Sequence, residues 1–198
     1  MEKTFEEHVR EKREEFRNNL KLEGFKVEFP DSKSFREIMK ENFSKVFDHP
    51  MSHYVAQGEE FQRALPVYRK YEECHHENMI LTDEDGKFVG HFCGESEDHS
   101  SFYLRNAGLI PEYRRQKIAT KFMEEFLSYL YKIGYARVTS QHHPTNNPVL
   151  IMMLQFGFHI AGVEIREEWG TLIKCVKLLS DDREKVFTRI VQGGNDIT

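Results

Sequence analysis

Apolar residues recur with helical spacing over a long stretch between residues 114 and 134. They fall at Ile118, Phe122, Phe126, Leu130 and Ile133. This spacing predicts an amphipathic helix with one broad buried face. We expect the helix to begin near Arg114 or Arg115 and to end at Gly134. A short extended run before it should stop at Pro111, because proline cannot donate to a strand ladder.

Shorter patterns on either side predict a chain that alternates strands and helices. Before the long helix we expect helices over 4–20 and 35–47, a helical region between 49 and 71, and strands over 24–29, 78–82, 87–94 and 101–110. After it we expect strands over 135–140, 158–165 and 171–178, a helix from Asn147 to Gly157, and a short C-terminal helix. This alternation indicates an α/β fold with a mixed sheet.

The first of these helices, over residues 4–20, has only a narrow apolar stripe. Thr4 and Glu7 have the spacing of a capping box. The stripe consists of Phe5, Val9, Phe16 and Leu20. Two interpretations stay open, because so thin a stripe suits either a solvated helix lying on the domain or a contact in a homodimer.

Composition and charge narrow the classes of function. The 198 residues are 39% hydrophobic and 31% charged, which suits one soluble, well-buried domain. A net charge of −5 argues against nucleic acid as a partner, since that requires a basic surface. No apolar run is long enough for a membrane span, and the charged N-terminus has no signal-peptide core. We therefore expect a cytoplasmic protein, and three widely spaced cysteines agree with a reducing compartment.

Three cations and no acid stand in the segment Arg114–Thr120, at the expected start of the long helix. The first N–H groups of a helix lack internal partners, and the helix dipole is positive there. Acidic residues usually occupy that end. Cations in their place favour an anion from outside, most naturally a phosphate. The alternative is an ordinary helix start with surface cations.

The segment from Pro111 to Ala119 resembles the acyl-CoA loop of the GNAT superfamily of N-acetyltransferases. That loop has the pattern Arg/Gln-x-x-Gly-x-Gly/Ala between a strand and a helix. Arg114 matches the first position of the pattern and Ala119 the last. Lys117 stands where the pattern has Gly. In a first helical turn Lys117 would have ordinary helical dihedrals, so its side chain could bend toward a bound phosphate.

A second match to the same family follows in the expected order. Asn146 and Asn147, with the later run Leu154-Gln-Phe-Gly-Phe158, resemble the family's Asn-containing helix that ends in Gly-Phe. The resemblance covers roughly residues 78–178 and, more weakly, 24–77. It implies a mixed, strongly twisted sheet of six or seven strands flanked by about four helices, with an extra N-terminal helix. It also implies that the central parallel strands splay to admit acetyl-CoA.

We accordingly divide the chain into three parts: an N-terminal helical extension over 1–22, a GNAT-like acetyltransferase domain over 23–180, and a C-terminal helix and tail over 181–198. The resemblance makes acetyl-CoA the acetyl donor. We expect Leu109 and Ile110, and either Asn146 or Asn147, to bind the pantetheine arm of acetyl-CoA. The residues expected to bind its pyrophosphate are Arg114, Arg115, Gln116, Lys117, Ile118, Ala119 and Thr120. For the asparagines, a helix cap is the equally weighted alternative.

Acid and base catalysis are less well specified by the sequence. The family often has a Tyr four residues before the Gly of Gly-Phe, where this chain has Met153. The candidates for the general base are Glu95, Glu97, Asp98, His142 and His143. We single out Glu95, His142 and His143, because family members often relay a proton through a strand carboxylate and histidine titrates near neutral pH. The alternative for each is a solvated or capping side chain.

The sequence therefore predicts an enzyme that moves an acetyl group from acetyl-CoA to a primary amine by direct attack. The acceptor is a small-molecule amine or a peptide amine, and the acidic chain mildly favours a cationic one. Cys74-His75-His76 and His91-x-Cys93 lack the paired spacing of a zinc site, so we assign no metal. Two alternatives remain: a CoA-binding protein without transferase activity, and an interaction domain that binds no CoA.

Overall fold

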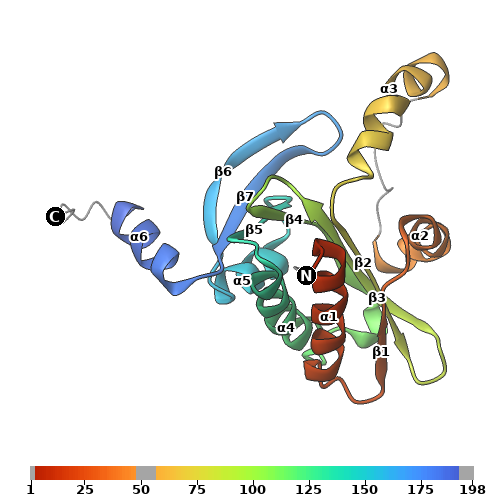
Figure 1. Cartoon of the computed structure of the whole chain (residues 1–198), viewed down its shortest axis with the longest axis horizontal. Helices are drawn as coiled ribbons and strands as arrows, with labels where there is room; N and C mark the ends of the chain where they lie inside the picture. Colours follow the sequence, from red (N-terminus) through yellow and green to blue (C-terminus); the bar gives the residue numbers. More distant parts are fainter. Residues whose placement is uncertain (1–2, 48–56, 192–198) are drawn as a thin grey trace.

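A computed structural model describes residues 3–47 and 57–191, which form one seven-stranded sheet with helices on both faces (Figure 1). The strands are β1 (Phe25–Glu28), β2 (His76–Asp83), β3 (Phe88–Ser96), β4 (Ser101–Leu109), β5 (Arg137–His142), β6 (His159–Arg166) and β7 (Gly170–Leu178). They lie in the order β1-β2-β3-β4-β5-β7-β6. Only β4 and β5 are parallel neighbours.

Six α-helices accompany the sheet in the described residues. They are α1 (Phe5–Asn19), α2 (Ser32–Val46), α3 (Gly58–Tyr71), α4 (Ile118–Ile133), α5 (Asn147–Gln155) and α6 (Asp181–Val191). The mixed sheet, its strand number and the extra N-terminal helix confirm the fold expected from the sequence. Part of the helical region expected between 49 and 71 lies outside the described residues.

The main core lies between the sheet and the layer formed by α1, α4 and α5. Phe122 and Phe126 of α4 are at most 1% exposed, and Phe102 of β4 contacts Phe126 with ring centroids 5.8 Å apart. The broad apolar face predicted for the long helix is therefore its buried face. A smaller core lies on the other face of the sheet, where Met39 and Phe43 of α2 pack on Ile80.

Helix α1 is part of the main core. Phe16 is 2% exposed, and its ring lies 5.5 Å from that of Phe122. The predicted capping box is present, since Thr4 and Glu7 each bond the other's backbone N–H. Val9 and Phe16, the two fully buried residues of the stripe, are thus used inside the chain, which favours the helix lying on the domain over a dimer contact made by the same residues.

A fully buried carboxylate, Glu77 of β2, further links α1 to the rest of the fold. Its oxygens accept from Arg13 of α1 at 3.0 Å, from His75 at 2.7 Å and from the Tyr129 hydroxyl of α4. A buried charge without partners is strongly destabilising, so these contacts fix how α1 and α4 sit on the sheet.

Helix α4 begins at Ile118, and the expected start near Arg114 or Arg115 is wrong. Lys117 precedes the helix with φ 60° and ψ 9°, in the left-handed region, and Arg115 also has a positive φ of 63°. The expected helical dihedrals of Lys117 are therefore also wrong. A side chain costs about 1 kcal/mol in this conformation. Lys117 thus occupies the Gly position of the loop pattern at a site whose backbone favours glycine.

We predict that Phe16→Ala destabilises the protein by about 3–5 kcal/mol, because it opens a cavity between α1 and α4. Urea denaturation measures the change. Phe5→Ala is the matched control, since Phe5 lies on the same helix but is 45% exposed and should cost far less. Equal effects of the two substitutions would contradict an integral role for α1.

We predict that Lys117→Gly stabilises the protein by roughly 1 kcal/mol, which raises the melting temperature by about 2–4 °C. The control is Lys117→Ala, which removes the same charge but leaves a Cβ at φ 60°. Thermal unfolding should show a gain for Gly only. A comparable gain for Ala would attribute the effect to charge rather than to backbone strain.

Candidate functional site

The parallel strands β4 and β5 separate halfway along β4. Their pairing begins at Ser101 with Arg137 and ends at Leu104 with Ser140. Strand β4 continues to Leu109, so its second half has no strand partner on the β5 side among the described residues. The splay expected from the sequence is present, and it leaves backbone hydrogen-bonding groups available at the centre of the sheet.

A β-bulge lies at the point of separation. Cys93 of β3 pairs with Asn106, but the next residue, Gly94, pairs with Leu104. Arg105 is therefore the extra residue of β4. A bulge bends the strand and redirects a side chain, and bulges are frequent beside active sites. The Arg105 side chain is 53% exposed although it belongs to a central strand.

The N-terminus of α4 lies just beyond the end of β4. No side chain caps this helix and no acid stands in its first turn. The N–H groups of Ile118, Ala119 and Thr120 have no acceptor within the helix, as at every helix start. Arg115 and Lys117, both exposed, add positive charge beside them. This arrangement favours an anion at the N-terminus of α4.

Arg114 has a different geometry from the other predicted phosphate ligands. Its Nε donates to the Leu109 carbonyl at 2.9 Å, and its Nη2 donates to the Val46 carbonyl at 2.8 Å. The side chain thus braces the loop against β4 and α2. The backbone N–H of Ile110 is likewise engaged, because it donates to the Val89 carbonyl of β3. By strand alternation, the Leu109 backbone faces the gap.

The second predicted motif lies at α5, after β5. Asn146 precedes the helix, and its side chain makes no cap hydrogen bond, so the capping alternative does not hold for this residue. Asn146 and Asn147 are both exposed. Met153, further along α5, is 1% exposed in the main core. At the position where the family often has Tyr, this chain therefore has a core-packing side chain that cannot donate a proton.

The sheet face opposite α4 is polar where β4 and β5 separate. We call it the open face, and it is formed by Glu95, Tyr103, Arg105, Thr139, Gln141, Glu164 and Lys174. The Tyr103 hydroxyl donates to Gln141 at 3.2 Å, and Gln141 donates to Glu164 of β6. These contacts join three strands by side chains where backbone pairing has ended.

Glu95, the predicted strand carboxylate, is 4% exposed and ion-paired. One of its oxygens accepts from Arg105 Nε at 2.9 Å, and the other accepts from Arg105 Nη2. The same Nη2 donates to the Tyr71 hydroxyl of α3 at 2.8 Å. Burial, together with Glu95, raises the pKa of Tyr71, so this hydroxyl stays protonated near neutral pH. Glu95 thus holds Arg105 in place.

The other two predicted catalytic residues do not join Glu95. Ser140 is in register with Leu104 of the main core, and alternation places Ser140 and His142 on that covered face. Burial lowers the pKa of His142 to about 4, and its Nε2 lies 2.9 Å from Ser140 Oγ. His143 follows β5, is exposed, and contacts Thr145 Oγ1 at 2.7 Å.

The remaining base candidates, Glu97 and Asp98, lie in the turn between β3 and β4. Asp98 accepts from the backbone N–H groups of Ser100 and Ser101 at 2.7 and 2.8 Å, which holds its pKa well below the usual range. Glu97 accepts from the Thr139 hydroxyl at 2.6 Å and pairs with Lys174 at 3.3 Å. Both carboxylates have structural partners.

Sequence reasoning overlooked Tyr71, Tyr103, Arg105 and Gln141. A signal was present in β4, where Phe102 and Leu104 alternate with Tyr103 and Arg105. A cation inside a strand that is apolar on its other face indicates a face left uncovered. The contacts of Arg105 with Glu95 and Tyr71 depend on strand pairing and had no local signal.

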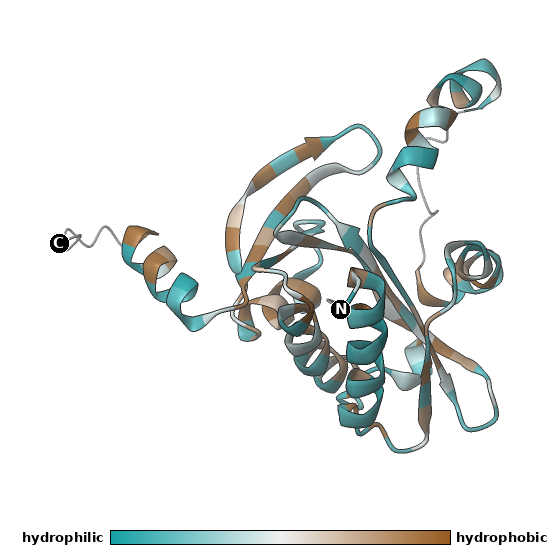
Figure 2. Cartoon of the chain, in the orientation of Figure 1, coloured by the Kyte–Doolittle hydropathy of each residue, from teal (hydrophilic) through white to brown (hydrophobic). Residues whose placement is uncertain are grey.

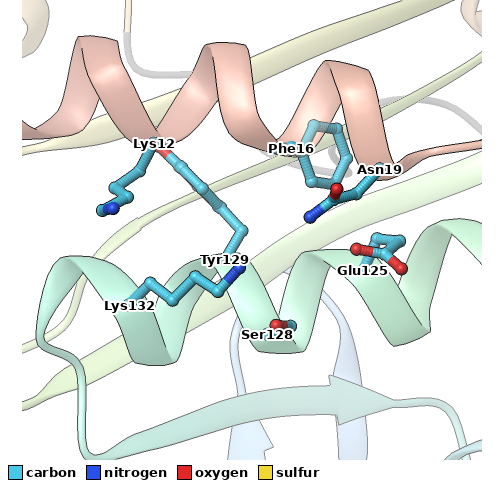
Figure 3. A pocket seen from close by; sticks show the side chains of 7 residues that line it. All are labelled: Lys12, Phe16, Asn19, Glu125, Ser128, Tyr129 and Lys132. Carbon is cyan, nitrogen blue, oxygen red and sulfur yellow. The ribbon is translucent and has the colours of Figure 1, made fainter.

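One groove lies outside this site, and neither a metal cluster nor a membrane-spanning helix is found in the described residues. Figure 3 shows a shallow groove along the seam of α1 and α4, lined by residues such as Lys12, Ser128 and Lys132 and by none of the predicted site residues. In the described part of the chain, no three His, Cys, Asp or Glu side chains are placed to hold a metal ion. Nor does any described helix have the length and apolar character needed to cross a membrane.

Known structures of the same fold include several acetyltransferases. Spermidine N-acetyltransferase from Vibrio cholerae is 14% identical with a TM-score of 0.60, over 83% of this chain and 99% of the other. The ribosomal-protein-S18-alanine N-acetyltransferase from Escherichia coli is 15% identical with a TM-score of 0.57, over 79% and 94%. The yncA protein from Salmonella typhimurium, solved with acetyl-CoA, is 11% identical with a TM-score of 0.56, over 80% and 95%.

Among curated protein sequences no relative matches. The model of the acetyltransferase (GNAT) family matches residues 33–158, well over half of the chain. This match includes the separation of β4 and β5, the loop before α4 and the helix α5. The chain therefore belongs to the GNAT family of acetyltransferases.

Proposed function

We propose that this protein is an N-acetyltransferase that moves an acetyl group from acetyl-CoA to a primary amine. The observation that carries the proposal is the end of β4–β5 pairing at Leu104 and Ser140, beside the uncapped N-terminus of α4. The first feature offers unpaired backbone groups to an extended ligand, and the second offers N–H donors to a phosphate. Acetyl-CoA has both parts.

The residues at the gap fit acetyl-CoA. The N–H groups of Ile118, Ala119 and Thr120 would bind the pyrophosphate, with Arg115, Gln116 and Lys117 around it. The Leu109 N–H group and the exposed amides of Asn146 and Asn147 would bind the pantetheine arm. Arg114 would act through the loop that it braces, and Ile110 through its bond to β3. When bound, acetyl-CoA supplies an activated acetyl group.

Proton transfer in this proposal depends little on a strong protein base. Glu95 is neutralised by Arg105, and His142, with a pKa of about 4, is a weak base near neutral pH. An α-amine has a pKa near 8, so roughly a tenth of it is already neutral at pH 7. A thiol has a pKa near 8.5, so the leaving thiolate is tolerable without the acid that Met153 cannot provide.

The names of two solved neighbours support the proposed acceptor class. Two of the solved neighbours are named for spermidine and for a ribosomal-protein alanine, which are a small amine and a protein amine. For this chain we propose a small-molecule or peptide amine. We also propose a homodimer, supported by β6, which is an edge strand of the sheet in the described residues. Hydrophobic residues recur along the β6 ribbon (Figure 2), and Val163 and Ile165 of this strand are 66% and 81% exposed. The cytoplasmic location stays a prediction.

The second candidate is a CoA-binding protein without transferase activity. The observation that favours it is Met153, buried where the family often has a proton donor. Steady-state release of CoA thiol across a panel of primary amines separates the two candidates. Release above the hydrolytic background with at least one amine supports the transferase.

We predict that Lys117→Glu weakens acetyl-CoA binding by about tenfold, because it places a negative charge at the N-terminus of α4. Calorimetric titration measures the affinity. The control is Lys26→Glu, the same charge reversal on β1, three strands from β4. Equal affinities for wild type and Lys117→Glu would contradict phosphate binding at this loop.

We predict that His142→Ala retains the wild-type pH dependence of kcat/KM between pH 5.5 and 8. Burial lowers the pKa of His142 to about 4, so the ring stays neutral throughout this range and becomes protonated only near pH 4. The rate should instead rise with pH toward the pKa of the acceptor amine and shift when the acceptor changes. His143→Ala is the parallel variant. A midpoint that disappears in either variant would identify a histidine base.

A further inference from the structure

Among the described residues, Arg105 is the only charged side chain of the open face that is held on one edge by hydrogen bonds and has no partner on its other edge. Its Nε and Nη2 contact Glu95, and Nη2 also contacts Tyr71. Its guanidinium lies 5.9 Å from the Tyr71 ring centroid and 5.6 Å from that of Tyr103. Within residues 3–47 and 57–191, no hydrogen bond or ion pair involves Nη1, and the side chain is 53% exposed.

The carboxylates of the open face, in contrast, are all engaged. Glu95 and Glu164 of this face, together with Glu97 from the adjoining turn between β3 and β4, present six oxygens in total. The partners of these oxygens are Arg105 on both oxygens of Glu95, Thr139 and Lys174 on Glu97, and Gln141 and Arg166 on Glu164. A polycationic acceptor would therefore meet carboxylates already paired with three cations. Among the charged side chains of the open face, the hydrogen-bonding groups left without a partner in the described residues are N–H donors.

Arg105 also lies at the point where an acceptor must approach. It is the bulged residue of β4, next to Leu104, where pairing with β5 ends. A guanidinium fixed on one edge keeps its other N–H donors in a set geometry, which suits recognition of a planar carboxylate. Tyr71 ties this geometry to α3, none of whose residues is buried.

We propose that Arg105 is a specificity-determining residue that binds a carboxylate of the acceptor, and that the acceptor is an amino acid rather than a polyamine. Its Nη1 edge donates to the carboxylate, while the amine of the same molecule lies toward the β4–β5 gap. Glu95 and Tyr71 are positioning residues for the guanidinium. The assignment rests on the proposed transferase function, and it departs from the cationic acceptor favoured by the net charge.

A purely structural ion pair is the alternative role for Arg105. Such a pair would affect folding, but it would not distinguish an amino acid from the amine that lacks its carboxylate. The test therefore compares matched acceptors. The panel consists of α-amino acids, β-alanine and 4-aminobutyrate, each paired with the amine that lacks the carboxylate, with spermidine as the polyamine.

Wild-type protein should show at least a tenfold higher kcat/KM for one or more amino acids than for the matched amine. Arg105→Gln should raise KM for that amino acid roughly ten- to a hundredfold, change kcat only a few fold, and abolish the preference. The double variant Glu95→Gln/Arg105→Gln should behave in the same way, and it avoids an unpaired buried carboxylate. Arg137→Gln, which removes an arginine paired with Asp98, is the control and should keep the preference.

Two results would overturn the assignment: turnover of amines or spermidine in preference to amino acids, or equal losses on both members of a pair in the Arg105 variants. Failure of the transferase proposal itself gives a different result, since the wild-type protein would then release no CoA thiol above the hydrolytic background with any amine of the panel, whether or not it binds acetyl-CoA by calorimetry.

Discussion

The early end of the pairing between β4 and β5 is the constraint on which the rest of this structure depends. The two strands share only the pairs from Ser101 with Arg137 to Leu104 with Ser140. Beyond that point β4 stays with β3, whereas β5 stays with β7. Buried backbone groups require partners, so a gap at the centre of a sheet is stable only if solvent, side chains or a ligand fill it. The site assembles around this gap because each neighbouring element contributes its end there.

Packing and polar contacts are divided between the two faces of the same strands. Phe102 and Leu104 of β4 lie in the core under α4, whereas Tyr103 and Arg105 project onto the open face. The covered face supplies the stability, which includes the buried Glu77 and its partners from α1 and α4. The open face can therefore hold charged side chains, because no helix has to bury them there. The bulge at Arg105 lies between the stabilising pairs of β4 with β5 and the open part of the site, because it occurs where regular pairing ends.

The left-handed backbone at Lys117 shows how the fold accepts a local cost at this site. The conformation sets the direction in which the chain enters α4, and so determines where the first N–H groups of the helix point. Strain of this kind persists when the surroundings fix the backbone. Here Arg114 fixes it, by bonding the ends of β4 and α2 from within the loop. An arginine that the sequence pattern associates with phosphate thus has a structural role.

The sequence by itself determined the order and type of the elements, the buried face of α4 and the family resemblance, because hydrophobic periodicity and turn residues report local backbone conformation. It also located the cationic loop and the two asparagines. Only the tertiary structure decided that α4 begins at Ile118, that Glu95 and His142 project from opposite faces, and that Arg105 lies between Glu95 and Tyr71. These facts depend on strand register, on one bulged residue and on contacts across more than thirty residues of sequence. No local pattern carries that information, because a shift of one residue in register moves every side chain to the other face.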